Sequence, residues 1–117
     1  MIAEPRKTGV LGELYAGRYL REKGYKLLSA NFRTKSGEID IIAEKDNTIC
    51  FIEVKTRREG AFFDPAFAVD KNKEENVKST AAAFITMRKY KKNIRFDIIE
   101  VIMSESDYRI RHTENAF

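Results

Sequence analysis

The chain has 117 residues, 43% hydrophobic and 34% charged, a balance that is typical of one globular domain and excludes a disordered chain. Its 22 Lys and Arg against 18 Asp and Glu give a net charge of +4, which permits nucleic-acid binding without requiring it. The apolar runs are too short to span a membrane, so we expect no membrane association. The N-terminus lacks the apolar core of a signal peptide, and the single Cys50 cannot form an internal disulfide, so we expect a cytoplasmic protein. We expect one domain over residues 1–117.

The sequence predicts a first helix over residues 8–23, capped by Thr8 and ended by Gly24 in the left-handed conformation. Glu13 lies in the middle of the apolar arc of this helix and not on its polar side. Gly12 precedes it, and a glycine there permits close approach by another backbone. Glu13 is therefore a candidate functional acid, and the alternative is a surface acid that the helix dipole favours. The arc comprises Val10, Glu13, Leu14, Ala16, Gly17 and Leu20.

Three strands, a second helix and two further strands should follow, which gives the order αβββαββ. The fourth strand is apolar at nearly every position, so we expect it inside the sheet. We predict an α/β fold: a single three-layer domain with a mixed β-sheet flanked by helices. Before the second helix, a loop with Pro65, Phe62, Phe63 and Phe67 should pack on the core. The predicted strands are 25–33, 38–44, 48–57, 94–103 and 108–113, and the second helix is 71–91, with Val77, Ala81, Phe84 and Ile85 on its apolar face.

The turn between the second and third strands determines which side chains meet. Asp46–Asn47 is a dipeptide that two-residue hairpin turns use. With that turn, the numbers of paired residues sum to 93, so Asp40 faces Glu53 and Glu38 faces Lys55. Residues that face each other or alternate along a strand share a face, so all four should form one cluster. A longer or bulged turn would shift this register.

Two neighbouring carboxylates repel each other unless a proton or a cation lies between them. Asp40 and Glu53 offer only oxygen ligands, which suit Mg²⁺ or Mn²⁺, and no His/Cys spacing suggests zinc. A metal held by Asp40 and Glu53 would acidify a bound water, and Lys55 would position that water or stabilise charge on a phosphate. The alternative is a cross-strand salt-bridge ladder on a solvated sheet face. Ile42 and Phe51 share the face with the acids, which argues against full solvation.

An acid followed by Glu-Val-Lys on the next strand resembles the reduced signature of the PD-(D/E)xK nucleases, with Asp40 as the first acid and Glu53 and Lys55 as the ExK pair. Over nearly its whole length the chain resembles the bacterial YraN family, small and largely uncharacterised proteins assigned a restriction-endonuclease-like fold. The matching motifs are Gly9-x-x-Gly12-Glu13, Asn31-Phe32-Arg33, Gly37-Glu38-Ile39-Asp40, Phe51-Ile52-Glu53-Val54-Lys55-Thr56-Arg57, Phe96-Asp97 and Asn115-Ala116-Phe117.

The fold is also similar to that of archaeal Holliday-junction resolvases, in which a glutamate of the first helix joins the metal site. Glu13 is the matching position, so the resemblance implies a metal site of Glu13, Asp40 and Glu53 that holds Mg²⁺ or Mn²⁺. It also implies nucleic acid as the partner, with DNA expected, and a homodimer. In related nucleases a glutamine often follows the lysine that matches Lys73; here Glu74 stands there, so the contact of that amide is in doubt. The residues that we expect on the nucleic acid are Arg33, Lys35, Thr56, Arg57 and Lys73.

The leading hypothesis is a metal-dependent nuclease in which Asp40, Glu53 and Lys55 are the catalytic residues. One rival is a nucleic-acid-binding module with the same fold but no turnover. The other is an assembly protein with a structural acidic ladder. We interpret the lone histidine, His112, and Asp97 as structural. The cations of the second helix and the residues after it are either phosphate contacts or an ordinary solvated face.

Overall fold

The computed structural model describes residues 5–60 and 70–117. Its element order is the predicted αβββαββ, and most bounds lie within about three residues of those expected. The predicted packed loop with Pro65, Phe62, Phe63 and Phe67 lies outside the described residues. Within the described ranges, neither helix is long and apolar enough to cross a membrane. The elements are α1 (Pro5–Glu22), β1 (Lys26–Thr34), β2 (Gly37–Lys45), β3 (Thr48–Arg58), α2 (Lys71–Arg88), β4 (Asn93–Met103) and β5 (Tyr108–Thr113).

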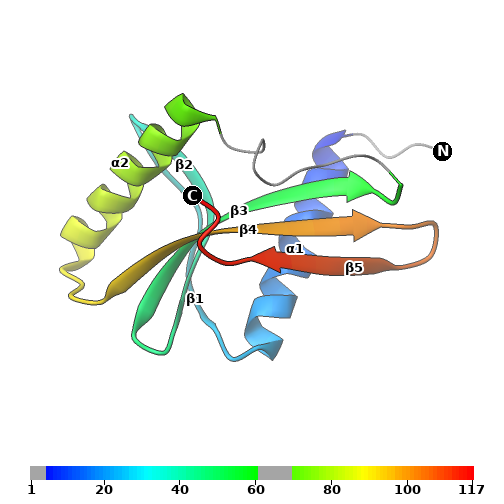
Figure 1. The fold of residues 1–117 in the computed structure, drawn as a ribbon, viewed down its shortest axis with the longest axis horizontal. Helices are drawn as coiled ribbons and strands as arrows, with labels where there is room; N and C mark the ends of the chain where they lie inside the picture. The colour runs from blue at the N-terminus through cyan, green and yellow to red at the C-terminus, as the bar shows by residue number, and fades with distance from the viewer. Residues whose placement is uncertain (1–4, 61–69) are drawn as a thin grey trace.

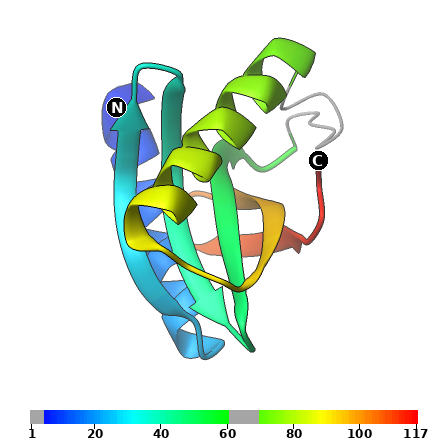
Figure 2. The ribbon, with the colours of Figure 1, turned by 90° about the vertical axis from the view of Figure 1, so that its left-hand side faces the viewer.

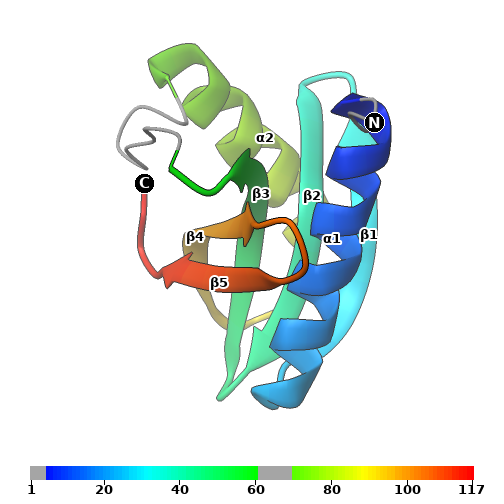
Figure 3. The same cartoon turned by 90° about the vertical axis from the view of Figure 1, so that its right-hand side faces the viewer.

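The five strands form one mixed sheet in the order β1-β2-β3-β4-β5 (Figure 1). β3 and β4 are parallel and are connected through α2, whereas the other neighbours are antiparallel. Figures 2 and 3 show α2 on one face of the sheet and α1 on the other. The predicted α/β fold is thus confirmed, and its three layers are consistent with a restriction-endonuclease-like arrangement. β4 lies inside the sheet, as its apolar sequence predicts.

Each helix buries its own apolar core against the sheet. Ala16 and Leu20 of α1 pack on the face that carries Ile41, Cys50 and Ile52. On the other face, α2 covers a cluster that includes Ile49 and Phe51. The predicted apolar face of α2 is confirmed, since Val77, Ala81 and Phe84 are buried and Ile85 packs beside them.

Both helix starts and ends follow local backbone chemistry. α1 begins at Pro5, so the prediction of Thr8 as its cap is wrong; proline suits a first helical turn, which needs no backbone N–H partner. Gly24 ends α1 with φ +92° as predicted. Asp70 caps α2 by accepting the Lys73 N–H at 2.8 Å. α2 ends at Arg88, earlier than predicted, because Lys89 adopts a left-handed conformation.

The apolar arc predicted for α1 is partly wrong. Val10 and Leu14 are 55% and 63% exposed, although Ala16 and Leu20 are buried. The helix approaches the sheet along a line that includes Gly12, where a Cβ would collide with the Thr56 hydroxyl group. The close approach that glycine permits therefore sets which face of α1 turns inward.

Candidate functional site

Asp40 lies at the point where β2 separates from β3. In the β1–β2 ladder, Asn31 and Asp40 are not paired, although pairing continues on both sides of them. The β2–β3 ladder ends at the pair Ile41–Ile52. Asn31 has φ +53°, a conformation that asparagine tolerates better than most residues. In the space between the strands, Asp40 Oδ2 accepts the backbone N–H of Val54 at 2.8 Å. This hydrogen bond fixes the carboxyl group of Asp40 at the edge of the broken ladder.

The predicted register is confirmed where the two strands pair. Lys45 faces Thr48 across a turn in which Asp46 and Asn47 have φ +51° and +59°, as a two-residue turn requires. The extension of this register to Glu38 opposite Lys55 is wrong, because the strands have separated there. Glu38 instead faces β1 and forms an ion pair with Arg33 at 2.6 Å. Glu38 therefore does not lie opposite Lys55 in the predicted cluster.

Glu53 is buried on the α2 side of the sheet and is held by two lysines. Its Oε1 lies 2.5 Å from Lys73 Nζ and 3.3 Å from Lys55 Nζ. Lys73 comes from the first turn of α2, whose cap fixes the direction of that turn. Burial alone would lower the pKa of Lys73, but the hydrogen bond and charge of Glu53 raise it above its ordinary value. A neutral Lys73 is therefore not expected at physiological pH.

The carboxyl groups of Asp40 and Glu53 meet despite the broken ladder. Burial, followed by the charge of Glu53, raises the pKa of Asp40 to about 7 against the opposing Val54 N–H bond. A hydrogen bond between the two carboxyl groups and the charge of Glu13 add to this rise. Asp40 is thus a half-buried acid beside two others, and negative charge at this point is costly without a counter-ion.

Glu13 approaches the same point from α1. Burial raises its pKa, and so do the charges of Glu38 and Glu53, while a hydrogen bond from the Asn31 side chain opposes the rise. A cavity of about 490 Å³ lies beside Glu13, between α1 and β1. Asn31 was not predicted as a site residue. Its signal in the sequence is an asparagine within a strand pattern, which marks a local departure from extended backbone.

The donor set fits a hard divalent cation, since Glu13, Asp40 and Glu53 offer oxygen atoms from three elements. As the side chains lie, no three His, Cys, Asp or Glu of residues 5–60 and 70–117 are grouped closely enough to hold a metal ion. Lys73 and Lys55 occupy Glu53 and provide part of the charge that a cation would provide. These two ammonium groups therefore offset the charge of Glu53.

The five residues predicted on the nucleic acid do not form one surface. Lys73 lies at the acids, and Arg57 contacts the buried Glu100 of β4 at 3.2 Å. Thr56 faces α1, on the other side of the sheet from Glu53. The remaining two are Arg33, paired with Glu38, and Lys35, exposed in the turn after β1.

The cations of α2 and the residues after it are divided between paired and open positions. Lys78 pairs with Glu74 at 2.7 Å, and Lys92 pairs with Glu44 of β2. Lys71 and Lys91 are exposed. This part of the chain therefore includes ion pairs that need no ligand.

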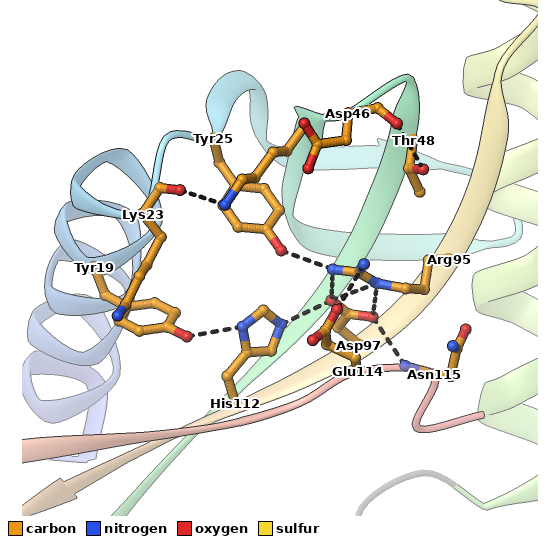
Figure 4. Close-up of polar contacts among 11 residues, drawn as sticks. Tyr19, Lys23, Tyr25, Asp46, Thr48, Arg95, Asp97, His112, Glu114 and Asn115 are labelled. Atoms are coloured by element: carbon orange, nitrogen blue, oxygen red, sulfur yellow. Dashed lines mark hydrogen bonds and ion pairs between the residues drawn. The ribbon is translucent and has the colours of Figure 1, made fainter.

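Asp97 and His112 belong to a separate polar cluster on the α1 side of the sheet (Figure 4). His112 Nε2 lies 2.7 Å from Asp97 Oδ2, and its Nδ1 lies 3.0 Å from the Tyr19 hydroxyl group of α1. Arg95 binds both Asp97 oxygens and donates to the Tyr25 hydroxyl at 2.7 Å. The cluster joins α1, β4, β5 and the segment before β1, which agrees with a structural role.

Comparison of the sequence with known proteins finds a matching family. A model described as "Uncharacterised protein family UPF0102" matches residues 12–101. The chain is 44% identical over 115 residues to a UPF0102 protein of Alkaliphilus oremlandii, covering 96% of this chain and 98% of that protein. It is 45% identical over 111 residues to a UPF0102 protein of Thermodesulfovibrio yellowstonii, covering 95% and 96%. Neither name states an activity.

Proposed function

We propose that this chain, which belongs to the uncharacterised protein family UPF0102, is a divalent-metal-dependent nuclease that hydrolyses phosphodiester bonds in nucleic acid. The family assignment agrees with the resemblance to YraN-like proteins. The observation that carries the proposal is Asp40, a half-buried acid with a pKa of about 7 between Glu53 and Glu13. Perturbed acids brought together from separate elements are typical of functional sites.

Asp40, Glu53 and Glu13 would hold Mg²⁺ or Mn²⁺. A bound divalent cation supplies a Lewis acid for the phosphate and lowers the pKa of water at the site. Lys55 lies on the same face as Glu53, where its ammonium group would orient the attacking water or neutralise charge on the phosphate. In hydrolysis the water oxygen forms a bond to phosphorus as the bond to the leaving sugar oxygen breaks. One proton leaves the water, and one reaches the leaving oxygen.

The proposal includes DNA as the expected substrate, branched forms among them, because of the resolvase resemblance. A homodimer and a cytoplasmic location belong to the same proposal. The net charge of +4 and the two lysines at Glu53 support a polyanionic partner.

The test is cleavage of labelled single-stranded, duplex and four-way-junction DNA, and of RNA, with Mg²⁺ or Mn²⁺. We expect cleavage by the parent and a loss of about 100-fold or more in Asp40→Asn and Glu53→Gln, since both remove a charged ligand without changing side-chain size. Asp46→Asn, in the exposed β2–β3 turn, is the matched control and should cleave like the parent. Absence of cleavage on every substrate, or full activity of Asp40→Asn, would contradict the proposal.

A second candidate is a nucleic-acid-binding module without turnover. It is favoured by the ion pairs of Glu53 with Lys73 and Lys55, which offset the charge of Glu53 without a metal. Calorimetric titration with Mn²⁺ separates the two functions. A nuclease binds Mn²⁺ in this titration and loses that binding in Glu53→Gln. A binding module of this kind gives no Mn²⁺ binding that depends on Glu53, and its affinity for DNA is the same with and without the metal.

A further inference from the structure

Glu100 is a buried acid that the proposed chemistry does not use. It lies in the apolar strand β4 with a fully buried side chain. Its Oε1 accepts a hydrogen bond from Arg57 Nε at 3.2 Å. Its Oε2 is buried and has no hydrogen-bond partner among the described residues, and Arg111 Nε lies 3.6 Å from it. An ionised carboxylate in this position is stable only if positive charge is kept close to it.

The two arginines around Glu100 are held differently. The Arg57 side chain is 17% exposed and is hydrogen-bonded to Glu100, whereas that of Arg111 is 57% exposed and lies beyond hydrogen-bond distance. Arg111 approaches the carboxylate with Nε, and within residues 5–60 and 70–117 its terminal nitrogens donate to no acceptor.

Arg111 also lies in line with the proposed site. In the sheet register, Lys55 of β3 faces Glu100 of β4, and Glu100 faces Arg111 of β5. Facing residues share a side of the sheet, so this row lies on the side of Glu53 and α2. Two strand spacings put the backbone of Arg111 about 10 Å from that of Lys55. α1 lies behind these strands in Figure 1, on the opposite face.

We infer that Arg111 binds a phosphate of the nucleic acid beside the cleavage site, and that the buried Glu100 positions its guanidinium group for this contact. The inference rests on the proposed function and specifies its substrate surface, which runs across β3, β4 and β5 from Lys55 to Arg111. About 10 Å corresponds to the axial rise of about three base pairs of a duplex, so a chain held at Lys55 reaches Arg111 within a few nucleotides. A planar guanidinium group with terminal nitrogens to donate matches the geometry of a phosphate.

The test measures binding without cleavage. All variants carry Asp40→Asn, metal is omitted, and the probes are fluorescent single-stranded, duplex and four-way-junction DNA over a series of salt concentrations. Arg111→Ala should weaken binding roughly tenfold near 0.1 M salt and reduce the slope of log affinity against log salt by about 1. Arg111→Lys should restore the slope in part. Arg18→Ala is the matched control, because Arg18 is exposed, pairs with the acid Glu22 and lies on α1.

The positioning role of Glu100 has a test of its own. Glu100→Gln makes the protein more positive, so charge alone predicts tighter binding. Positioning predicts weaker binding, and no further weakening when the same change is made in Arg111→Ala. Circular dichroism and melting temperature identify variants that fail to fold. Because Arg111 is exposed, the Arg111→Ala result stands even if Glu100→Gln does not fold.

The outcomes separate the inference from the proposed function. Equal effects of Arg111→Ala and Arg18→Ala, or an unchanged salt slope in Arg111→Ala, overturn the inference and leave the nuclease proposal intact. Tighter binding by Glu100→Gln overturns the positioning role. If Arg111→Ala loses DNA affinity and Arg18→Ala does not, while the protein with Asp40 intact cleaves no substrate, the inference is supported and the nuclease proposal is contradicted. A parent that binds none of the probes overturns both.

Discussion

Lys73 brings an ammonium group to an oxygen that a metal would also need. Its Nζ lies 2.5 Å from Glu53 Oε1, beside the half-buried Asp40. We expect Lys73→Met to raise the affinity for Mn²⁺ by roughly threefold to tenfold, because Glu53 then loses a competing cation. Isothermal titration calorimetry without nucleic acid measures this directly. Lys78→Met is the control, since Lys78 is on the same helix and pairs with Glu74.

The same substitution distinguishes two roles of Lys73. A lysine that only balances charge gives a variant with tighter Mn²⁺ binding and unchanged cleavage at saturating metal. A lysine that also contacts the phosphate gives tighter metal binding but slower cleavage. Weaker Mn²⁺ binding by Lys73→Met would contradict the competition, because it would mean that the ammonium group supports the metal site.

At the scale of elements, the contact of α1 with β3 places Glu13. A Cβ at Gly12 would collide with the Thr56 Oγ1 and lie 3.2 Å from its Cβ, so rotation of the threonine cannot remove the crowding. We expect Gly12→Ala to lower the free energy of unfolding by about 1–3 kcal/mol despite the better helix propensity of alanine. It should also weaken Mn²⁺ binding, since the adjacent Glu13 moves with the helix.

Gly9 of the same helix provides the matched control. A Cβ at Gly9 meets no described atom within 4 Å, so Gly9→Ala should raise stability by up to about 1 kcal/mol through helix propensity alone. Urea unfolding of both variants gives the comparison. If Gly12→Ala is as stable as Gly9→Ala, then α1 has room to retreat and its distance from β3 does not fix Glu13.

Across the whole molecule, local patterns predicted the elements better than the site. Asp46–Asn47 gave the turn and hence the register, because backbone chemistry within four residues determines both. The separation of β2 at Asp40 was missed, since it depends on Asn31 of another strand and on the Val54 N–H. The exposure of Val10 was missed because the approach of α1 is set by Thr56, far away in the sequence.

The Asp97 cluster should make the stability of the whole fold sensitive to acid. Burial alone would raise the pKa of Asp97, but hydrogen bonds from His112 and Arg95 and from the Asn115 N–H together lower it. A carboxyl group with a lowered pKa in the folded state stabilises above its unfolded pKa of about 4, and this stabilisation is lost as the pH falls below that value. Burial raises the pKa values of the surrounding Tyr19, Tyr25 and Cys50, so these groups stay neutral over that range.

We therefore expect Asp97→Asn to lower the free energy of unfolding by about 3 kcal/mol at neutral pH, because Arg95 loses its buried partner. The difference between parent and variant should begin to shrink as the pH falls below about 4, the unfolded pKa, and should continue to shrink until the folded carboxylate, whose pKa is lower, is also protonated. Urea unfolding over a pH series measures both effects. Glu114→Gln removes an exposed partner of the same arginine and should cost under about 1 kcal/mol. A difference that stays constant with pH would show that Asp97 stabilises the fold through shape and not through charge.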